Sequence, residues 1–283
     1  MDVSIVVLTW EDFERTEACV RSLPPGVETV VVDNGSAAGI GAALRALCAG
    51  TGARYVRAET NLGYARGMNL GVRHSTRSRV ILSNNDIVVR PGAIERLAAE
   101  LDDPTVGAAF PKVLDVDGQD RTAAGRFLTV GAGLAHATGL SLVVPSLRIV
   151  APPERGDWLS GPFVAIRRET LDRIGGVDES SFFYSEDLRL CWAVRRSGLR
   201  LAYLPDAVVT HEDDASAKRR WPVEEIARRQ TREFIRASRE LAGWRGTVAC
   251  AAYTLGVVAR AAVGGGAARR AVARGAIEGL GAR

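Results

Sequence analysis

The sequence predicts an α/β fold in which helices cover both faces of a mainly parallel sheet. Over residues 1–110, β-branched runs that end in polar turns alternate with segments whose apolar residues recur at helical spacing. Of the 283 residues, 47% are hydrophobic and 25% are charged, which is typical of a globular protein with a sizeable core and excludes a disordered or fibrous chain. Parallel strands need crossover helices, so the alternation favours a sheet that is buried on both sides.

The first half of the chain contains four strand–helix units. The expected strands cover residues 3–8, 29–32, 55–56 and 80–82, and the expected helices cover 11–23, 40–48 and 65–74, with a fourth helix opened by Pro91.

The second half is less regular. From Phe110 to about Trp158, short segments with Gly and Pro indicate loops or antiparallel strands. Regularity then returns with strands over 163–167, 201–203 and 207–210, helices near Glu169 and over 186–196, and mostly helices after residue 211.

Charge is distributed unevenly along the chain. The net charge is +4, but residues 217–283 hold 14 Lys and Arg against 5 Asp and Glu, which leaves −5 for the rest. This basic segment favours contact with a membrane surface, because it lacks the interleaved aromatic residues that nucleic-acid binding would need. Its longest uncharged stretch, residues 246–259, is shorter than the ~20 residues of a spanning helix.

The ends and the cysteines indicate a cytoplasmic protein. The first residues lack the basic region of a signal peptide. The four cysteines are far apart, so we expect buried free thiols in a reducing compartment and no zinc site. They are Cys19, Cys48, Cys191 and Cys250.

Three polar loops follow three of the expected strands. They begin at Thr9, Asp33 and Asn84, and in a parallel sheet such loops converge at the carboxyl edge, where ligands bind. Asp86 in the third loop presents a carboxylate that could hold Mg²⁺ or Mn²⁺ together with substrate phosphates. The alternative is that this loop only caps a turn before Pro91.

Two further positions carry candidate chemistry. His211 ends an expected strand beside the acidic run Glu212-Asp213-Asp214, where a neutral imidazole is a suitable divalent-metal ligand. Glu186 and Asp187 open a helix directly after the aromatic cluster of residues 182–184, which suits a general base in a partly desolvated setting. Simple capping of the helix remains the alternative.

Two side chains suit a nucleotide. Asp33 could accept a hydrogen bond from a nucleobase or ribose, or else form an Asx turn. Arg66, near an expected helix start, suits a diphosphate. The only dinucleotide-type glycine pattern begins at Gly39 and is weak, and neither a phosphate-binding loop ending in Gly-Lys-Ser/Thr nor a Gly-x-Ser-x-Gly elbow is present.

Together, these segments resemble the family 2 glycosyltransferases, which have the A-type glycosyltransferase (GT-A) fold. The motifs occur in order through residues 3–211: VSIVVLTW, VETVVVDNGS, NLGYARGMNLG, VILSNNDIVVRPGAI, VGAAFPKV, the WLSGPFV to VRRSG segment, and LAYLPDAVVTH. The Asn-Asn-Asp motif is most similar to the rhamnosyltransferase-like branch that serves bacterial polysaccharide and cell-wall synthesis.

The resemblance implies a role for each matching residue. Thr9, Glu11 and Asp33 would surround the nucleoside, Arg66 and Asn69 would lie near the diphosphate, and Asn85 would belong to the same donor site. Asp86 and His211 would hold Mg²⁺ or Mn²⁺, Asp187 beside Glu186 would be the catalytic base, and Trp158 and Gly161 would lie beside the sugar and acceptor.

It also implies a reaction and an organisation. A metal-dependent, inverting transferase would move a sugar, with rhamnose as a candidate, from a dTDP- or UDP-sugar to a glycan or lipid-linked acceptor. Residues 1–112 would bind the nucleotide-sugar, 113–216 the acceptor, and 217–283 would be a basic helical extension. The extension would place the enzyme on the inner face of the membrane or pack on the protein, for instance in a homodimer.

This sequence departs from the family pattern at three positions. Asn84 stands where many members have Asp, Glu11 where Asn or a small polar residue is usual, and Arg189 where a second aspartate is common. The Gln-x-x-Arg-Trp signature of processive synthases is absent, which favours transfer of a single sugar. The rival interpretations are a catalytically impaired nucleotide- or glycan-binding module and a sugar-nucleotide pyrophosphorylase.

Overall fold

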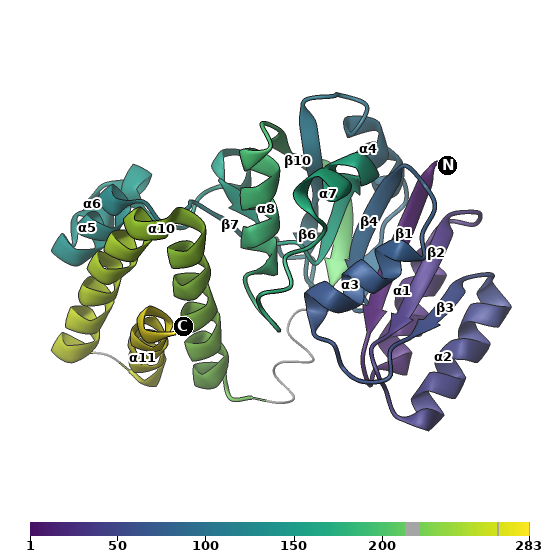
Figure 1. The fold of residues 1–283 in the computed structure, drawn as a ribbon, viewed down its shortest axis with the longest axis horizontal. Helices are drawn as coiled ribbons and strands as arrows, with labels where there is room; N and C mark the ends of the chain where they lie inside the picture. Colours follow the sequence, from purple (N-terminus) through teal and green to yellow (C-terminus); the bar gives the residue numbers. More distant parts are fainter. Residues whose placement is uncertain (213–220, 265, 283) are drawn as a thin grey trace. The chain divides into compact units, whose positions relative to one another are not determined.

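The structure, a computed structural model, describes residues 1–212, 221–264 and 266–282. It contains two compact units, whose elements are labelled in Figure 1. The first comprises Met1–Ala123, Leu159–Glu186 and Leu190–Asp213, and the second comprises Ala124–Trp158, Asp187–Arg189 and Asp214–Arg283. The sequence was interpreted as three consecutive segments, 1–112, 113–216 and 217–283. In the structure, residues 124–158 group with the C-terminal helices.

The first unit is built on an eight-stranded sheet with the order β3-β2-β1-β4-β9-β6-β10-β5. Strands β1 to β4 are parallel neighbours, and β9 runs antiparallel between β4 and β6. The strands are β1 (Val3–Thr9), β2 (Glu28–Asp33), β3 (Arg54–Arg57), β4 (Arg79–Asn84), β5 (Ile87–Val89), β6 (Val106–Leu114), β9 (Phe163–Arg167) and β10 (Arg200–His211). The helices are α1 (Phe13–Ser22), α2 (Ala38–Thr51), α3 (Tyr64–Arg73), α4 (Ala93–Glu100), α7 (Arg168–Ile174) and α8 (Glu186–Arg196), with Asp187–Arg189 of α8 grouped in the second unit.

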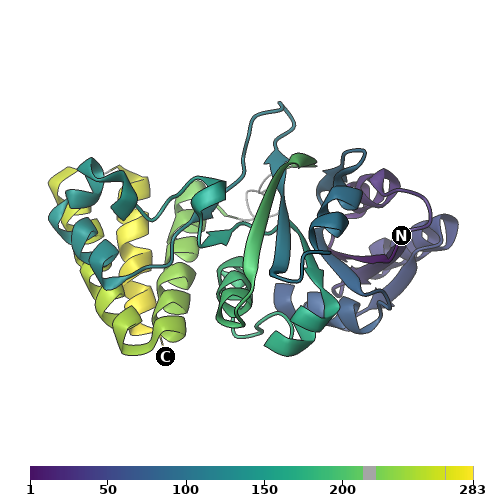
Figure 2. The same cartoon turned by 90° about the horizontal axis from the view of Figure 1, so that it is seen from above.

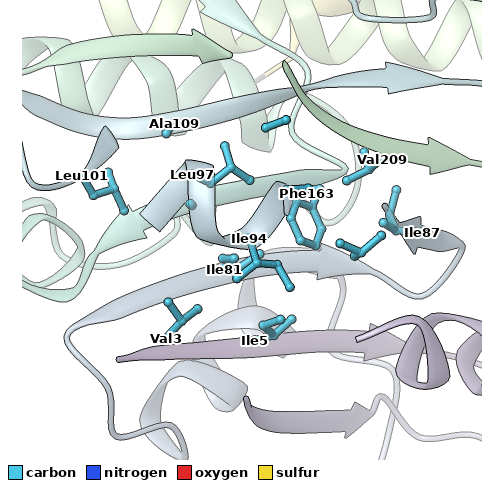
Figure 3. Close-up of a cluster of buried hydrophobic side chains, with 14 of the residues drawn as sticks. Val3, Ile5, Ile81, Ile87, Ile94, Leu97, Leu101, Ala109, Phe163 and Val209 are labelled. Carbon is cyan, nitrogen blue, oxygen red and sulfur yellow. The ribbon is translucent and has the colours of Figure 1, made fainter. Parts of the chain in front are cut away.

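Alternate residues of the buried strands face opposite helical layers, as the period of a strand requires. Ile5 of β1 belongs to a core cluster with α4, which Figure 3 shows. Val6, its neighbour, faces α3, where a Cβ on Gly71 would lie 2.2 Å from a Val6 methyl. Glycine therefore lets α3 approach the sheet closely, and helices cover both faces as predicted.

The second unit is mainly helical. Its elements are α5 (Val130–Thr138), α6 (Leu140–Val143), α10 (Val223–Gly264), α11 (Ala267–Gly281), the strands β7 (Ala124–Gly125) and β8 (Trp158–Leu159), and the 3-10 turns η1 (Pro145–Leu147) and η2 (Pro153–Arg155). The chain leaves helical geometry at Gly243 (φ 59°, ψ −135°), so α10 is two helices joined by a kink.

Small residues bring α5 and α11 close to α10, and Figure 2 shows these helices from a second direction. A Cβ on Gly133 of α5 would lie 2.4 Å from the Ala249 carbonyl oxygen, and one on Gly275 of α11 would lie 2.2 Å from the Arg228 carbonyl oxygen. Ala249, Cys250 and Ala276 are fully buried at this centre. The packing explains why residues 124–158 and the C-terminal helices form one unit.

The expected elements of the first half are all present, with shifted ends. α1 begins at Phe13 and not at Glu11, because Asp12 caps it by accepting a hydrogen bond from the Arg15 N–H. The fourth helix begins at Ala93, after Gly92 in a left-handed conformation. The short strand β5 was not predicted.

Three features of the second half differ from expectation. β6 is a continuous nine-residue strand. The two strands expected over 201–203 and 207–210 form one strand, β10, with an irregularity between Leu204 and Val208. α5, rich in Gly and Ala, was not expected.

The four cysteines are buried free thiols, as predicted, and burial raises the pKa of Cys19 and Cys250 to about 12.

Candidate active site

The three polar loops at the carboxyl edge of the sheet contact one another, as predicted. The Asn34 N–H donates to the Thr9 carbonyl at 2.9 Å, and the Glu11 N–H donates to the Ser36 hydroxyl at 2.9 Å. In the third loop, the Asn85 side-chain amide lies 3.5 Å from the Thr9 hydroxyl at the end of β1 and 3.2 Å from the Thr16 hydroxyl of α1. These hydrogen bonds join the ends of β1, β2 and β4 into one surface.

Asp86 and His211 are neighbours because β5 and β10 pair antiparallel. The register aligns His211 with Ile87, and the Glu212 N–H donates to the Asp86 carbonyl at 3.1 Å. The two side chains meet with His211 Nε2 3.1 Å from Asp86 Oδ1, and they are only 13% and 9% exposed. The fold thus unites two candidate metal ligands that are far apart in the sequence.

This pair fits a divalent cation. Apart from the approach of His211, Asp86 Oδ1 is buried without a hydrogen-bond donor among the residues that the structure describes. A carboxylate oxygen and an imidazole nitrogen are both ligands of Mn²⁺. No cluster of three or more His, Cys, Asp or Glu side chains suitable for a metal occurs in the described part of the chain. The remaining ligands would therefore be phosphate oxygens and water.

Asp33 ends β2 with both carboxylate oxygens engaged. Oδ1 accepts from the Ser36 N–H at 2.8 Å, and Oδ2 accepts from the Tyr55 hydroxyl at 2.6 Å and from the Arg57 guanidinium. Burial raises the pKa of the Asp33 carboxyl, but the hydrogen bonds from Tyr55 and Ser36 and the charge of Arg57 outweigh it and lower the pKa. The carboxylate is therefore a charged anchor for Arg57.

Arg57 was not identified from the sequence. It ends β3, donates to the Ser36 carbonyl at 2.6 Å, and is 34% exposed. A Cβ on Gly41 would lie 2.2 Å from its Nη1, so glycine leaves room for the guanidinium. In the sequence, Arg57 directly follows the expected strand at residues 55–56, and this position could have indicated it. In the structure, the register of β2 and β3 aligns Arg57 with Asp33.

Glu11 has a structural partner at the start of α2. Its Oε1 accepts from the Ala37 N–H at 2.7 Å, at the positive end of the helix. Its backbone is left-handed, with φ 55°. The carboxylate thus joins the first loop to the second.

The side chains of Thr9 and Asn85 make hydrogen bonds with other residues of the site and of α1. Thr9 is 1% exposed, donates to the Asp12 carbonyl at 3.2 Å and accepts from Thr16 at 2.7 Å. The Asn85 amide lies over the same two hydroxyls. Both residues hold the shape of the loops that carry Asp86.

Arg66 and Asn69, on α3, share a neighbour that the sequence did not indicate. Arg66 Nε lies 3.4 Å from Glu179 Oε2, and the Asn69 amide donates to Glu179 Oε1 at 2.9 Å. Asn69 also bonds both the N–H and the carbonyl of Val177. Arg66 is the more available for an anion, since its side chain is 61% exposed.

Glu186 and Asp187 are the first two residues of α8 and follow two residues with a strained backbone. Tyr184 and Ser185 both have left-handed backbones, with φ 73° and 67°. Non-glycine residues in this region cost of order 1–3 kcal/mol each and cluster at functional sites. Asp187 Oδ1 accepts from the Leu188 N–H at 2.7 Å. The backbone conformation of Tyr184 and Ser185 therefore sets the direction in which α8 begins.

Trp158 and Gly161 lie on either side of the junction after β8. The Trp158 indole packs so closely on Gly125 that a Cβ there would lie 2.6 Å away, and its Nε1 is buried without a hydrogen-bond acceptor among the described residues. Gly161 precedes Pro162, whose carbonyl accepts from the Asn84 N–H at 2.8 Å. This bond places Gly161 next to the Asn-Asn-Asp motif.

Comparisons with known proteins identify relatives of this chain. The chain is 25% identical over 204 residues to a low-salt glycan biosynthesis hexosyltransferase of Haloferax volcanii, covering 71% of this chain and 64% of that protein. It is 28% identical over 265 residues to an N-acetylglucosaminyl-diphospho-decaprenol L-rhamnosyltransferase of Mycobacterium tuberculosis, covering 85% of each.

The fold has a solved counterpart. The structure resembles the mannosyltransferase PcManGT from Pyrobaculum calidifontis, solved with GDP-Man and Mn²⁺, with a TM-score of 0.57 and 18% identity over 98% of this chain and 79% of that one. This likeness confirms the predicted GT-A fold. The family model for "Glycosyltransferase like family 2" matches residues 2–235. The chain therefore belongs to glycosyltransferase family 2, as its motifs predicted.

Proposed function

We propose that this glycosyltransferase moves one sugar, with inversion, from a nucleoside diphosphate sugar to a hydroxyl of a glycan or lipid-linked acceptor. The observation that carries the proposal is the Asp86–His211 pair, two mostly buried metal-type ligands 3.1 Å apart at the carboxyl edge of the sheet. Because the pair offers only two ligands, it suits a cation that is completed by a diphosphate.

The donor would lie along the joined loops. Asp86 and His211 would hold Mg²⁺ or Mn²⁺, which supplies positive charge to the leaving diphosphate when bound. Arg66 would add a second positive charge to the diphosphate. Arg57, held by Asp33, would face the base, and Thr9, Glu11 and Asn85 would keep the loops in place. The GDP-Man and Mn²⁺ of the solved mannosyltransferase support a nucleotide-sugar and a divalent cation in general.

The acceptor hydroxyl would be activated by Asp187. Its carboxylate would take the hydroxyl proton while the acceptor oxygen forms a bond to the anomeric carbon and the bond from that carbon to the diphosphate oxygen breaks. Attack opposite the leaving group inverts the configuration. Glu186 would support Asp187, and Trp158, with its buried indole N–H, and Gly161 would lie beside the sugar and acceptor.

The experiment is a thermal-shift panel of dTDP-, UDP- and GDP-sugars with and without Mn²⁺ or Mg²⁺, followed by a transfer assay. A ligand that binds only the folded state at 100 times its Kd stabilises it by about 2.7 kcal/mol. We expect a metal-dependent shift that is largest for a pyrimidine nucleotide-sugar. Nucleotide binding with no turnover on any acceptor would favour the impaired binding module, and sugar-nucleotide formation from a nucleoside triphosphate and a sugar phosphate would favour the pyrophosphorylase.

We further propose that the second unit attaches the enzyme to the inner face of the membrane, where a lipid-linked acceptor would be reached. Trp244, Val248 and Leu255 share one face of the second half of α10 and are 72%, 44% and 66% exposed. Arg245 and the exposed arginines of α11 would meet anionic head groups. Homodimerisation through the same face is the alternative. The basic run at residues 218–220 lies outside the described residues.

Only part of the basic charge is available for this role. Arg228 bonds Glu278 at 2.6 Å, Arg236 bonds Glu240 at 2.9 Å, and Arg260 donates to the His136 carbonyl at 2.6 Å. One helix of the described chain, α10, has the length and composition of a membrane span, but a third of that stretch is buried in the protein. The kink at Gly243 also interrupts α10. Attachment to the membrane surface therefore suits it better than crossing.

A further inference from the structure

Arg189, one of the three residues that depart from the family pattern, is buried in the first turn of α8. Its side chain is 3% exposed, and its guanidinium donates to Glu240 Oε2 on α10. Glu240 Oε1 in turn accepts from Arg236 Nε at 2.9 Å. A buried arginine is tolerated when it is paired, and the Glu240 carboxylate offsets part of the cost of burying this one.

The pair is charged on both sides. Burial raises the pKa of the Glu240 carboxyl, but the hydrogen bonds and charges of Arg189 and Arg236 outweigh it and lower the pKa. Removing Glu240 would take from Arg189 its charged partner on α10, where the Arg189 side chain is only 3% exposed. The contact is therefore a specific tie between α8 and α10.

The beginning of α8 needs such a tie. The chain enters the helix through two left-handed non-glycine residues, Tyr184 and Ser185, so local backbone preference does not favour this geometry. Asp187–Arg189 also group with the C-terminal helices, whereas Leu190 and the residues after it group with the sheet unit. The turn that carries Asp187 therefore has its contacts mainly with the elements of the second unit.

We infer that Glu240 positions the first turn of α8 through Arg189 and thereby sets the direction of the Asp187 carboxylate. Residues two apart on a helix point in different directions, so Arg189 can pair with α10 while Asp187 faces elsewhere. The C-terminal helices then serve transfer itself as well as any attachment. This inference rests on the proposed role of Asp187 as general base.

The test uses the full chain and three changes. Glu240→Gln and Arg189→Met each break the ion pair, and the double variant Arg189→Glu with Glu240→Arg restores it with the charges exchanged. Small displacements of a catalytic group cost on the order of 10²-fold in rate, so we expect each single variant to lower kcat by roughly that factor. The donor KM should change little, and the exchanged pair should recover most of the kcat.

Glu278→Gln is the matched control. It breaks the Arg228–Glu278 ion pair between α10 and α11, which has the same chemistry but does not involve α8. We expect near-normal kcat for this variant. A loss of kcat equal to that of Glu240→Gln, or a normal kcat in Glu240→Gln, would overturn the inference.

Hydrogen exchange gives a readout that does not require turnover. In Glu240→Gln, amides of peptides covering residues 184–190 should exchange at least tenfold faster, while those of α3 stay unchanged. Unchanged exchange over 184–190 refutes the positioning role, even in a protein without transferase activity. Faster exchange together with normal transfer by Asp187→Asn would instead show that the tie exists and that the proposed base is wrong.

Discussion

His211 Nε2 lies 3.1 Å from Asp86 Oδ1, and the antiparallel register of β5 and β10 fixes this distance. Asp86→Ala should therefore abolish the metal-dependent part of nucleoside diphosphate binding and with it sugar transfer. Calorimetry of the nucleoside diphosphate with Mn²⁺ and with EDTA measures the first effect, and product formation measures the second. Asp172→Ala, an exposed carboxylate on α7, is the control. If Asp86→Ala transfers sugar normally in either condition, the metal role of Asp86 is wrong.

Asp187→Asn should separate chemistry from binding. A positioned general base contributes ~10²–10⁴-fold in rate, so turnover should fall by that order while donor affinity stays nearly unchanged. Glu186→Gln, one residue away, should have a smaller effect. Steady-state kinetics at saturating donor, with donor Kd measured by titration, distinguishes the two. Near-normal turnover in Asp187→Asn, or a loss explained entirely by weaker donor binding, contradicts the assignment.

Asp33→Asn should destabilise the protein at neutral pH and much less in acid. The folded state lowers the pKa of this carboxyl below its ordinary value of 3.8, so its stabilising contribution is complete above that value. The contribution is lost as the pH falls through the lower pKa of the folded state. Hydrogen bonds to charged groups contribute about 1.5–3 kcal/mol, which sets the expected difference at pH 7.

Urea unfolding of Asp33→Asn and of the wild type, at several pH values from 7 down to the acid limit of folding, measures this difference. Tyr55→Phe removes only one donor to Asp33 and should give a smaller effect with the same pH dependence. A stability difference that stays constant through the acid range would show that the Asp33 carboxylate is not stabilised by its partners.

Gly41→Ala should displace Arg57 from Asp33. The added Cβ would lie 2.2 Å from Arg57 Nη1, and the flexible guanidinium would move before the backbone does. We expect roughly tenfold weaker nucleotide binding, and about the same affinity in the double variant with Arg57→Ala, because both changes remove one interaction. Gly39→Ala, on the same helix with open space at its Cβ, is the control. Additive losses in the double variant would mean that Gly41 acts independently of Arg57.

Trp244→Ser with Leu255→Ser should weaken co-sedimentation with phosphatidylglycerol vesicles at low salt. The two changes remove exposed apolar contacts and leave the arginines in place, so the salt-sensitive part of binding should persist. Val116→Ser, exposed on the sheet unit, should have no effect. Point changes are preferable to deletion, because α10 packs on α5. Failure of the intact protein to bind vesicles, or equal binding by the double variant, would refute membrane attachment through this face.

The sequence by itself determined the order and type of the elements that form the carboxyl edge. Val3, Thr29 and Val80 begin nearly continuous runs of β-branched and apolar residues, each followed by polar residues and then a helical period. Local patterning was enough because parallel strands with crossover helices must place their polar ends together. The glycosyltransferase family and the GT-A fold were likewise predicted from ordered motifs and are confirmed.

Only the tertiary structure decided which distant residues meet. The register that places His211 beside Asp86, the ion pair that anchors Arg57 on Asp33, and the tie from Arg189 to Glu240 all join separate elements. Burial in the packed fold, where each charge needs a partner, selects these pairs, and no local pattern of charge or hydropathy specifies them. The grouping of residues 124–158 with the C-terminal helices has the same origin, since glycines such as Gly133 acquire their role only when another helix approaches.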